Sequence, residues 1–396
     1  MLAPTHRGLV RYLSAAVLAR GADAGAGIGL LLLCVDPASG LDRPVLVGGL
    51  LVAGLTAPHL LGPLLARPLD RLRDTRMMLA AAMAGYGILL AAATLGLGRL
   101  PLLAVGLLVA LAGACGPLLT GGLSSRLVSI VGTEQQRRRR GEGWDAVSYG
   151  VSGSLGPAVV AALAAATSAR WALIALACAA VAAAGVTLLL PAAGSATRRE
   201  PARSTRDVLR TMIIFGPLRR VSYPTMITAL VLGGISVVAV RLAPELGHPA
   251  ASGAVLAAAL GIGNLVGSTA VTVRPLRGEP ERLTALFVGV IALALLLASV
   301  MPSFPLALGA FFLIGAANAP FFAATLAARS EYAPVGGRAQ LFVAIAAFKI
   351  AAGSAGTAIA GALNGVGPRP LLMVGAALLA TTALATVIER RLDHER

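Results

Sequence analysis

The chain has 396 residues, of which 57% are hydrophobic and only 13% are charged, and its mean hydropathy is +0.84. Soluble domains carry about 45–50% apolar and about 25% charged residues, so this composition excludes an ordinary soluble domain and is typical of a polytopic membrane protein. The net charge of +16 would suit a nucleic-acid partner. The charges lie between the apolar runs, however, which favours membrane topology and argues against nucleic-acid binding.

Twelve apolar runs are long enough to cross a bilayer, for which a helix needs about 20 residues. None of them shows the alternation in short strands that a transmembrane barrel requires. We therefore predict an all-α integral membrane protein with twelve transmembrane helices. Their approximate ranges are 9–34, 44–66, 77–98, 101–125, 143–166, 169–191, 222–243, 250–273, 283–301, 304–328, 338–364 and 368–388.

The basic residues are divided unevenly between the loops. If the N-terminus is cytoplasmic, the inner loops and tails hold 25 of the 33 basic residues and the outer side holds five. Because Lys and Arg are enriched in cytoplasmic loops, this count predicts a multi-pass protein of the plasma (inner) membrane with both termini cytoplasmic. The first apolar run is long enough to remain as a span, so we expect no cleaved signal peptide.

The longest polar segment separates the spans into six and six. We expect an N-terminal six-helix bundle over 1–191, a cytoplasmic linker over 192–221 and a C-terminal six-helix bundle over 222–396. The later part of the linker, 207–215, is a candidate for a short helix on the membrane surface.

Three short patterns recur in corresponding spans of the two halves, which indicates an internal repeat. They are Arg67-Pro68-Leu69 with Arg274-Pro275-Leu276, Pro117 and Arg126 with Pro320 and Arg329, and Gly153 to Ala158 with Gly353 to Ala358. Two parallel six-helix repeats joined by a linker are typical of a large class of secondary transporters.

With these features the chain resembles the major facilitator superfamily over nearly its whole length. The family loop after the second span, Gly-x-Leu-Ala-Asp-Arg-x-Gly-Arg, is matched here only at Asp70 and Arg71, and both glycines are missing. The resemblance implies two repeats around a central cavity and a cytoplasmic gate at this loop. Asp70 would lie at the start of the eleventh span, where the helix dipole favours an anion. Arg126 and Arg329 are the expected partners, and ordinary topology charge is the alternative for each residue.

Proton-coupled exporters of this superfamily carry a Gly-x-x-x-Gly-Pro-x-x-Gly-Gly motif in the fifth span. This chain has Gly153, Gly156 and Pro157 but lacks the last two glycines. Small residues allow close helix approach, and proline loosens the helical hydrogen bonding. The resemblance favours export, while generic tight packing is the alternative.

Charged residues inside a membrane are costly, which makes them functional candidates. Arg20 and Asp23 are three residues apart in the first span and share a helical face, where they can pair. Asp23 is the candidate proton-binding or cation-binding carboxylate, with a structural ion pair as the alternative. His59 in the second span titrates near neutral pH and is a candidate for a proton relay, or a histidine held by a backbone carbonyl.

Three further polar residues lie at depth in the second half. Asn264 and Asn318 are candidates for substrate binding or for a hydrogen bond between helices. Lys349 is the only lysine of the chain. We expect it to face the central cavity and to contact an anionic substrate group or Asp23, with a snorkelling structural lysine as the alternative.

No Walker, zinc or Ser-His-Asp pattern is present, and the three cysteines have no metal-ligand spacing. We therefore predict no enzyme, no cofactor and no bound metal. The leading hypothesis is a monomeric alternating-access transporter that uses protons to export a small organic compound across the lipid bilayer. Uptake or facilitated diffusion on the same fold, and a non-transporting membrane receptor, are the alternatives. The sequence does not identify the substrate.

Overall fold

A computed structural model of the chain describes residues 4–36, 39–72, 74–132, 134–192, 203–249, 252–363 and 365–394. Within these ranges every regular element is helical and no strand occurs. Eleven helical spans are long and apolar enough to cross a membrane. The helices α11 (Gly216–Gly233) and α12 (Ile235–Glu245) form a pair bent by 40° and would make the twelfth span. The prediction of an all-α membrane protein is confirmed.

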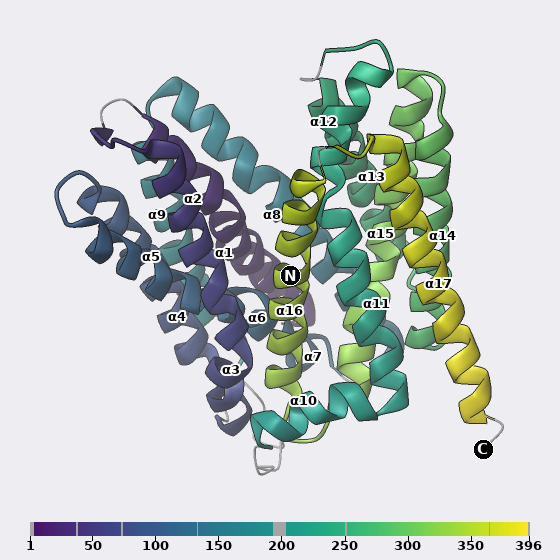
Figure 1. The fold of residues 1–396 in the computed structure, drawn as a ribbon. Helices are drawn as coiled ribbons and strands as arrows, with labels where there is room; N and C mark the ends of the chain where they lie inside the picture. The colour runs from purple at the N-terminus through teal and green to yellow at the C-terminus, as the bar shows by residue number, and fades with distance from the viewer. Residues whose placement is uncertain are drawn as a thin grey trace. The chain divides into compact units, whose positions relative to one another are not determined.

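The elements follow the predicted spans closely (Figure 1). In chain order the others are α1 (Pro4–Val35), α2 (Pro44–Thr56), η2 (Ala57–Leu61), α3 (Gly62–Arg71), α4 (Arg76–Gly96), α5 (Leu102–Pro117), η3 (Leu118–Gly122), α6 (Leu123–Ser125), α7 (Leu127–Val131), α8 (Gln135–Ala166), α9 (Ala169–Leu188), α10 (Thr205–Ile214), α13 (Gly253–Val273), α14 (Pro280–Val300), α15 (Phe304–Tyr332), α16 (Arg338–Ala362) and α17 (Pro368–His394). The short helix expected near 207–215 is α10.

Two compact units make up the chain. Unit 1 comprises Met1–Arg138, Val151–Val208 and Pro334–Ala347, and unit 2 comprises Arg139–Gly150, Leu209–Ala333 and Phe348–Arg396. The helices α8 and α16 therefore each contribute residues to both units. The simpler division into 1–191, 192–221 and 222–396 stays a prediction from the sequence.

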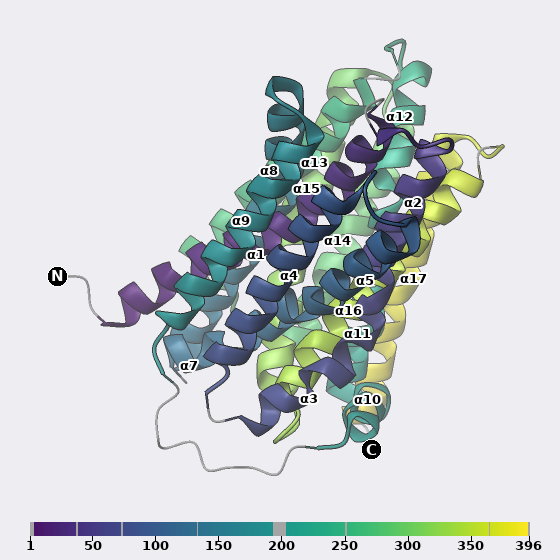
Figure 2. The ribbon, with the colours of Figure 1, turned by 90° about the vertical axis from the view of Figure 1, so that its left-hand side faces the viewer.

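In unit 1, α1, α4 and α9 pack side by side (Figures 1 and 2). Arginines near the beginnings of α1 and α4 and at the start of α7 donate hydrogen bonds to the backbone just beyond the end of α9. Arg11 reaches Leu189 O at 2.7 Å, Arg76 reaches Leu190 O at 2.9 Å and Arg126 reaches Pro191 O at 2.7 Å. The beginnings of the first and third spans and the ends of the fourth and sixth spans therefore meet on one side, as a bundle of alternately up and down helices requires.

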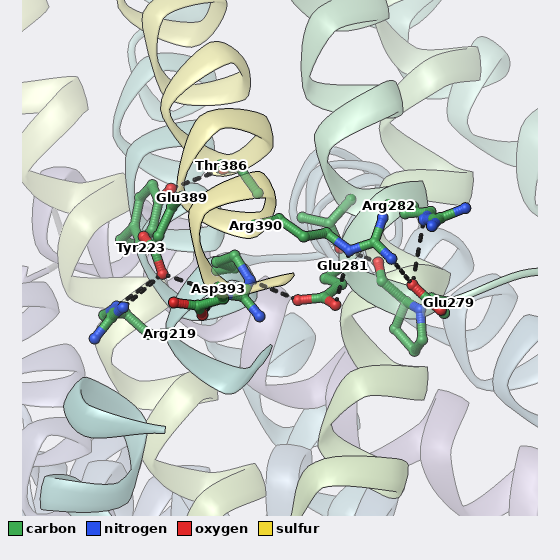
Figure 3. Close-up of polar contacts among 12 residues, drawn as sticks. Arg219, Tyr223, Glu279, Glu281, Arg282, Thr386, Glu389, Arg390 and Asp393 are labelled. Atoms are coloured by element: carbon green, nitrogen blue, oxygen red, sulfur yellow. Dashed lines mark hydrogen bonds and ion pairs between the residues drawn. The ribbon is translucent and has the colours of Figure 1, made fainter. Parts of the chain in front are cut away.

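Unit 2 shows the same alternation. At one end, Arg241 of α12 donates to Leu363 O at 3.2 Å, and Arg369 of α17 donates to Ser299 O at 2.8 Å. At the other end, the starts of α11 and α14 meet the end of α17 in a network of ion pairs (Figure 3). The helices of this unit therefore also run alternately up and down.

Glycines of the repeated small-residue pattern permit equivalent helix contacts in the two units. A Cβ added at Gly156 of α8 would overlap the backbone of Gly21 in α1, and one added at Gly356 of α16 would overlap the backbone of Leu230 in α11. A Cβ at Gly153 would meet no atom within 4 Å. The repeat therefore brings α8 against α1 and α16 against α11, and Gly156 rather than Gly153 is the residue that this packing requires.

Candidate functional site

Three titratable side chains from three segments of unit 1 meet among apolar residues. His59 of η2 is 3% exposed, and its Nε2 atom lies 3.8 Å from Oδ2 of Asp23 in α1, whose side chain is 16% exposed. Tyr86 of α4 is fully buried and lies within electrostatic reach of the same carboxylate. The structure therefore brings together Asp23 and His59, which the sequence proposed separately.

The imidazole reaches Asp23 because the second span is broken at His59. The 3-10 turn Ala57–Leu61 separates α2 from α3, and the prolines at positions 58 and 63 lack the amide hydrogens that would continue a regular helix. Gly116 of α5 leaves the space, since a Cβ there would overlap the imidazole ring. The Nδ1 atom is buried without a hydrogen-bond partner in the described ranges. The contact with Asp23 fits the candidate proton relay, and the choice between that role and a structural histidine stays a prediction.

Arg20 does not pair with Asp23. Among the described residues the basic side chain near Asp23 is His59, whereas Arg20 donates to Ser124 Oγ at 2.9 Å and to Thr120 O and Tyr12 Oη at 3.4 Å. Side chains on a helix lean toward its N-terminus, and a long arginine therefore reaches away from a carboxylate one turn later. The π-helical turn η3 provides the carbonyl of Thr120.

In unit 2 an aromatic cluster surrounds the single lysine of the chain. Lys349 Nζ of α16 lies 3.8 Å from the centre of the Phe322 ring of α15, and Tyr149 of α8 packs edge-on against that ring at 5.0 Å. The described residues offer the ammonium group no hydrogen bond or ion pair. A cation held mainly by the face of an aromatic ring keeps its three hydrogen-bond donors for another group.

Arg329, near the end of α15, is the largest fully buried side chain of the described residues, with 1% of it exposed. Its guanidinium lies 5.8 Å from the centre of the Phe322 ring and within electrostatic reach of Asp145 and Tyr149. Unit 2 therefore places Arg329 beside the ring that also contacts Lys349. The partnership of Arg329 with Asp70 stays a prediction from the sequence.

The two candidate asparagines of unit 2 bind each other. Asn318 Nδ2 donates to Asn264 Oδ1 at 3.3 Å, which links α15 to α13. Glycines at positions 263, 267 and 315 bring these two helices into backbone contact around the pair. The hydrogen bond between helices, one of the two alternatives for these residues, is therefore present, and substrate binding stays a prediction.

Asp70 lies where the family resemblance implied. Its two carboxylate oxygens accept hydrogen bonds from the amides of Ala339 at 2.8 Å and Gln340 at 3.0 Å, in the first turn of α16. A carboxylate on two free amide groups at a helix N-terminus is favoured by both hydrogen bonding and the helix dipole. Arg71 is exposed and makes no polar contact within the described ranges.

The expected pairing of Arg126 with Asp70 differs from the structure. Arg126 lies 3.8 Å from Asp74, in the loop before α4, and donates to Pro191 O. Arg76 also binds Asp74, at 2.6 Å. The hydrogen bond from the Arg76 guanidinium is the main reason that the pKa of the Asp74 carboxyl lies below its ordinary value. Arg126 therefore stabilises this loop rather than the start of α16.

Sequence reasoning missed the aromatic members of both clusters. Tyr86 lies within electrostatic reach of Asp23, Tyr149 lies within electrostatic reach of Arg329, and the Phe322 ring contacts Lys349. Aromatic residues make up only 4% of the chain. A tyrosine inside an apolar span of such a chain was the available signal, since its hydroxyl needs a polar partner there.

Residues 24–356 match the sequence-family model of the Major Facilitator Superfamily, so the chain belongs to this family. No curated protein matches it in sequence. Three solved structures are similar. The human organic anion transporter MFSD10 (TETRAN) has a TM-score of 0.78 and 16% sequence identity, and the match covers 97% of this chain and 100% of that one. A bacterial homologue of the iron transporter ferroportin has a TM-score of 0.75 and 14% identity, with coverage of 98% and 100%, and the proton:xylose symporter XylE has a TM-score of 0.72 and 13% identity, with coverage of 96% and 94%. At these identities the likeness establishes the fold, which is that of membrane transporters rather than enzymes.

We predict that Asp70→Asn weakens the attachment of α16. The amide presents one accepting oxygen where the carboxylate presents two, and it carries no charge for the helix dipole, so the free energy of unfolding should fall by about 1.5–3 kcal/mol. Hydrogen–deuterium exchange at residues 338–342 should accelerate and transport should slow. Asp42→Asn, which changes an exposed carboxylate without a described partner, is the control. Unchanged exchange and transport in Asp70→Asn would remove the gate role.

Proposed function

We propose that this chain is an alternating-access secondary transporter that uses the proton gradient to export a small organic compound. Membership of the family supports transport. The observation that carries proton coupling is the proximity of Asp23, whose side chain is 16% exposed, to the buried His59 in unit 1, at 3.8 Å. A carboxylate within a membrane span is a functional candidate, and a neighbouring histidine supplies a second group that can take up a proton.

In the proposed coupling step, Asp23 takes up one proton and later releases it to the opposite side of the membrane. His59 is a positioning residue beside the carboxylate, with its Nε2 atom 3.8 Å from Asp23 Oδ2. Tyr86 lies close enough to interact with the ionised carboxylate. One proton on the pair would reduce its charge and therefore the cost of moving it through an apolar environment.

We propose that Lys349 binds a negatively charged group of the substrate. Its ammonium has donors free and an aromatic ring on one side, so a carboxylate or phosphate would complete its coordination. Arg329, beside the same ring, adds positive charge. The similarity to a human organic anion transporter supports this class of substrate.

Export rests on the Gly156-Pro157 pair of α8, which matches the core of the exporter motif. Uptake is the second candidate, because XylE, one of the similar structures, is a proton:sugar symporter. Both directions use the same alternating-access cycle with a proton site and a substrate site. A receptor without transport activity is the third alternative, and any substrate-dependent proton flux in proteoliposomes would exclude it.

We propose that the protein lies in the plasma membrane as a monomer, with the arginine-rich loops and both termini in the cytoplasm. In a variant without native cysteines, an impermeant thiol reagent added outside should label Ser39→Cys and spare Ser204→Cys, because the two positions follow spans one and six. The opposite labelling pattern would overturn the orientation.

We predict that Asp23→Asn abolishes proton-driven accumulation in proteoliposomes and leaves substrate exchange, because the amide cannot carry the proton. His59→Gln should retain coupling and alter the pH dependence of transport, since glutamine can hydrogen-bond to Asp23 and cannot titrate. His248→Gln, at a histidine of unit 2 far along the chain, should match the parent. Uphill transport at the parent rate in Asp23→Asn would place the coupling site elsewhere.

We predict that Lys349→Gln and Lys349→Ala express normally and bind an anionic substrate more weakly, by about 1.5–3 kcal/mol or roughly tenfold to a hundredfold in Kd. Lys349→Arg should restore only part of the affinity, because the larger planar guanidinium differs in shape from an ammonium beside the Phe322 ring. Affinities are measured over a panel of organic anions and neutral analogues. If all three variants transport every compound like the parent, Lys349 has no substrate role.

A further inference from the structure

Unit 2 contains a hollow of about 600 Å³ between α14 and α17, at the end where its arginines gather. The residues that line the hollow change from basic to apolar along the helices. Arg282, Arg390 and Arg391 lie at one end, and the exposed side chains of Leu286 and Val387 lie on the membrane side of them. The volume falls in the range of about 300–1,000 Å³ found for small-molecule sites.

Among the described residues that line the hollow, Glu281 is the one acidic residue, and its charge is already neutralised. Its Oε2 atom accepts a hydrogen bond from Arg220 Nε at 2.7 Å, and its Oε1 atom accepts one from Arg390 Nε at 3.2 Å. Figure 3 shows Arg390 placed between Glu281 and Glu279, which it also contacts. A negatively charged ligand in the hollow would therefore meet a carboxylate whose charge is balanced.

The described ion pairs around the hollow contain equal numbers of arginines and carboxylates, and one more arginine lines the hollow outside these pairs. The pairs join four arginines to four carboxylates, namely Arg219, Arg220, Arg282 and Arg390 with Glu279, Glu281, Glu389 and Asp393. Arg391 lines the hollow and forms no ion pair with any described residue. The pair of Arg282 and Glu279 is exposed on both sides at 3.3 Å, so it is weak and readily exchanged for another anion.

The apolar side of the hollow continues along the same helices. Leu286 and Leu293 of α14 are 57% and 58% exposed, and Leu384 of α17 is 59% exposed. In a membrane-spanning helix such residues face lipid chains. A ligand with a phosphate at the arginine end and hydrocarbon along these leucines would match both parts.

We infer that this hollow binds the phosphate headgroup of an anionic phospholipid, with the acyl chains lying along α14 and α17. Guanidinium groups bind phosphate oxygens through paired, charge-assisted hydrogen bonds. Basic pockets between transmembrane helices are suited to anionic headgroups. The site is separate from Lys349 and Asp23, and it does not depend on the proposed transport function.

The test is lipid binding to the purified full-length protein, followed by native mass spectrometry with phosphatidylglycerol and phosphatidylcholine. Phosphatidylglycerol should bind about tenfold more tightly, as expected for charge-assisted contacts. The Arg282→Gln/Arg391→Gln variant should lose that preference. Arg277→Gln, at an exposed arginine of the same unit outside the hollow, should keep it.

Two further variants keep the test decisive if the glutamine variant fails to fold. Val387→Trp fills the hollow from an exposed position without changing charge and should also weaken phosphatidylglycerol binding. Arg282→Lys/Arg391→Lys keeps the charge and should bind with intermediate affinity. Equal binding of phosphatidylcholine, full displacement of the lipid by excess inorganic phosphate, or unchanged binding in both the filled and the neutral variants would each overturn the inference.

Discussion

The cost of placing charge in an apolar environment is the constraint on which the rest of this structure depends. A charged side chain at the centre of a membrane helix costs about 2.5–3.5 kcal/mol even on the mildest scales. Arg20 donates hydrogen bonds to two hydroxyls and a carbonyl, which offset this cost. Asp23 lies beside His59, and Arg220 forms ion pairs with carboxylates from two other helices. Lys349 is different, since its described contact is an aromatic face. A charge that the chain itself leaves incompletely satisfied is the natural place for a charged ligand.

Close backbone contact is the second condition, because these polar partners meet only if the helices approach tightly. Gly116 leaves room for the His59 imidazole, and Gly315 and Gly263 bring α13 and α15 together beside the asparagine pair. Lipid supplies no hydrophobic force between helices, so close packing and short hydrogen bonds must hold them. The small residues of this chain therefore serve the polar clusters as well as the general fold.

Hydropathy and charge predicted the helical class and the approximate spans, because both depend on local composition. The partners of the buried charges were harder to predict. Helical spacing put Arg20 next to Asp23, while the structure pairs Asp23 with a histidine 36 residues later in the chain. That contact depends on which helices are neighbours and on a 3-10 turn between two prolines, neither of which a spacing rule contains. Asp70 was placed correctly at α16 because a helix N-terminus attracts a carboxylate whatever its neighbours are.

The helix α16 offers a physical route between the two candidate sites. Its first turn, in unit 1, is held by Asp70, and Lys349 follows ten residues after Ala339, in the part of the helix that belongs to unit 2. Ten residues of α-helix span about 15 Å, so the two points are joined by one stiff element. Coupling between sites requires an element with two arrangements that both sites bias. In this chain α16 is the continuous element shared by the two units, and a second arrangement of it is what such coupling would require.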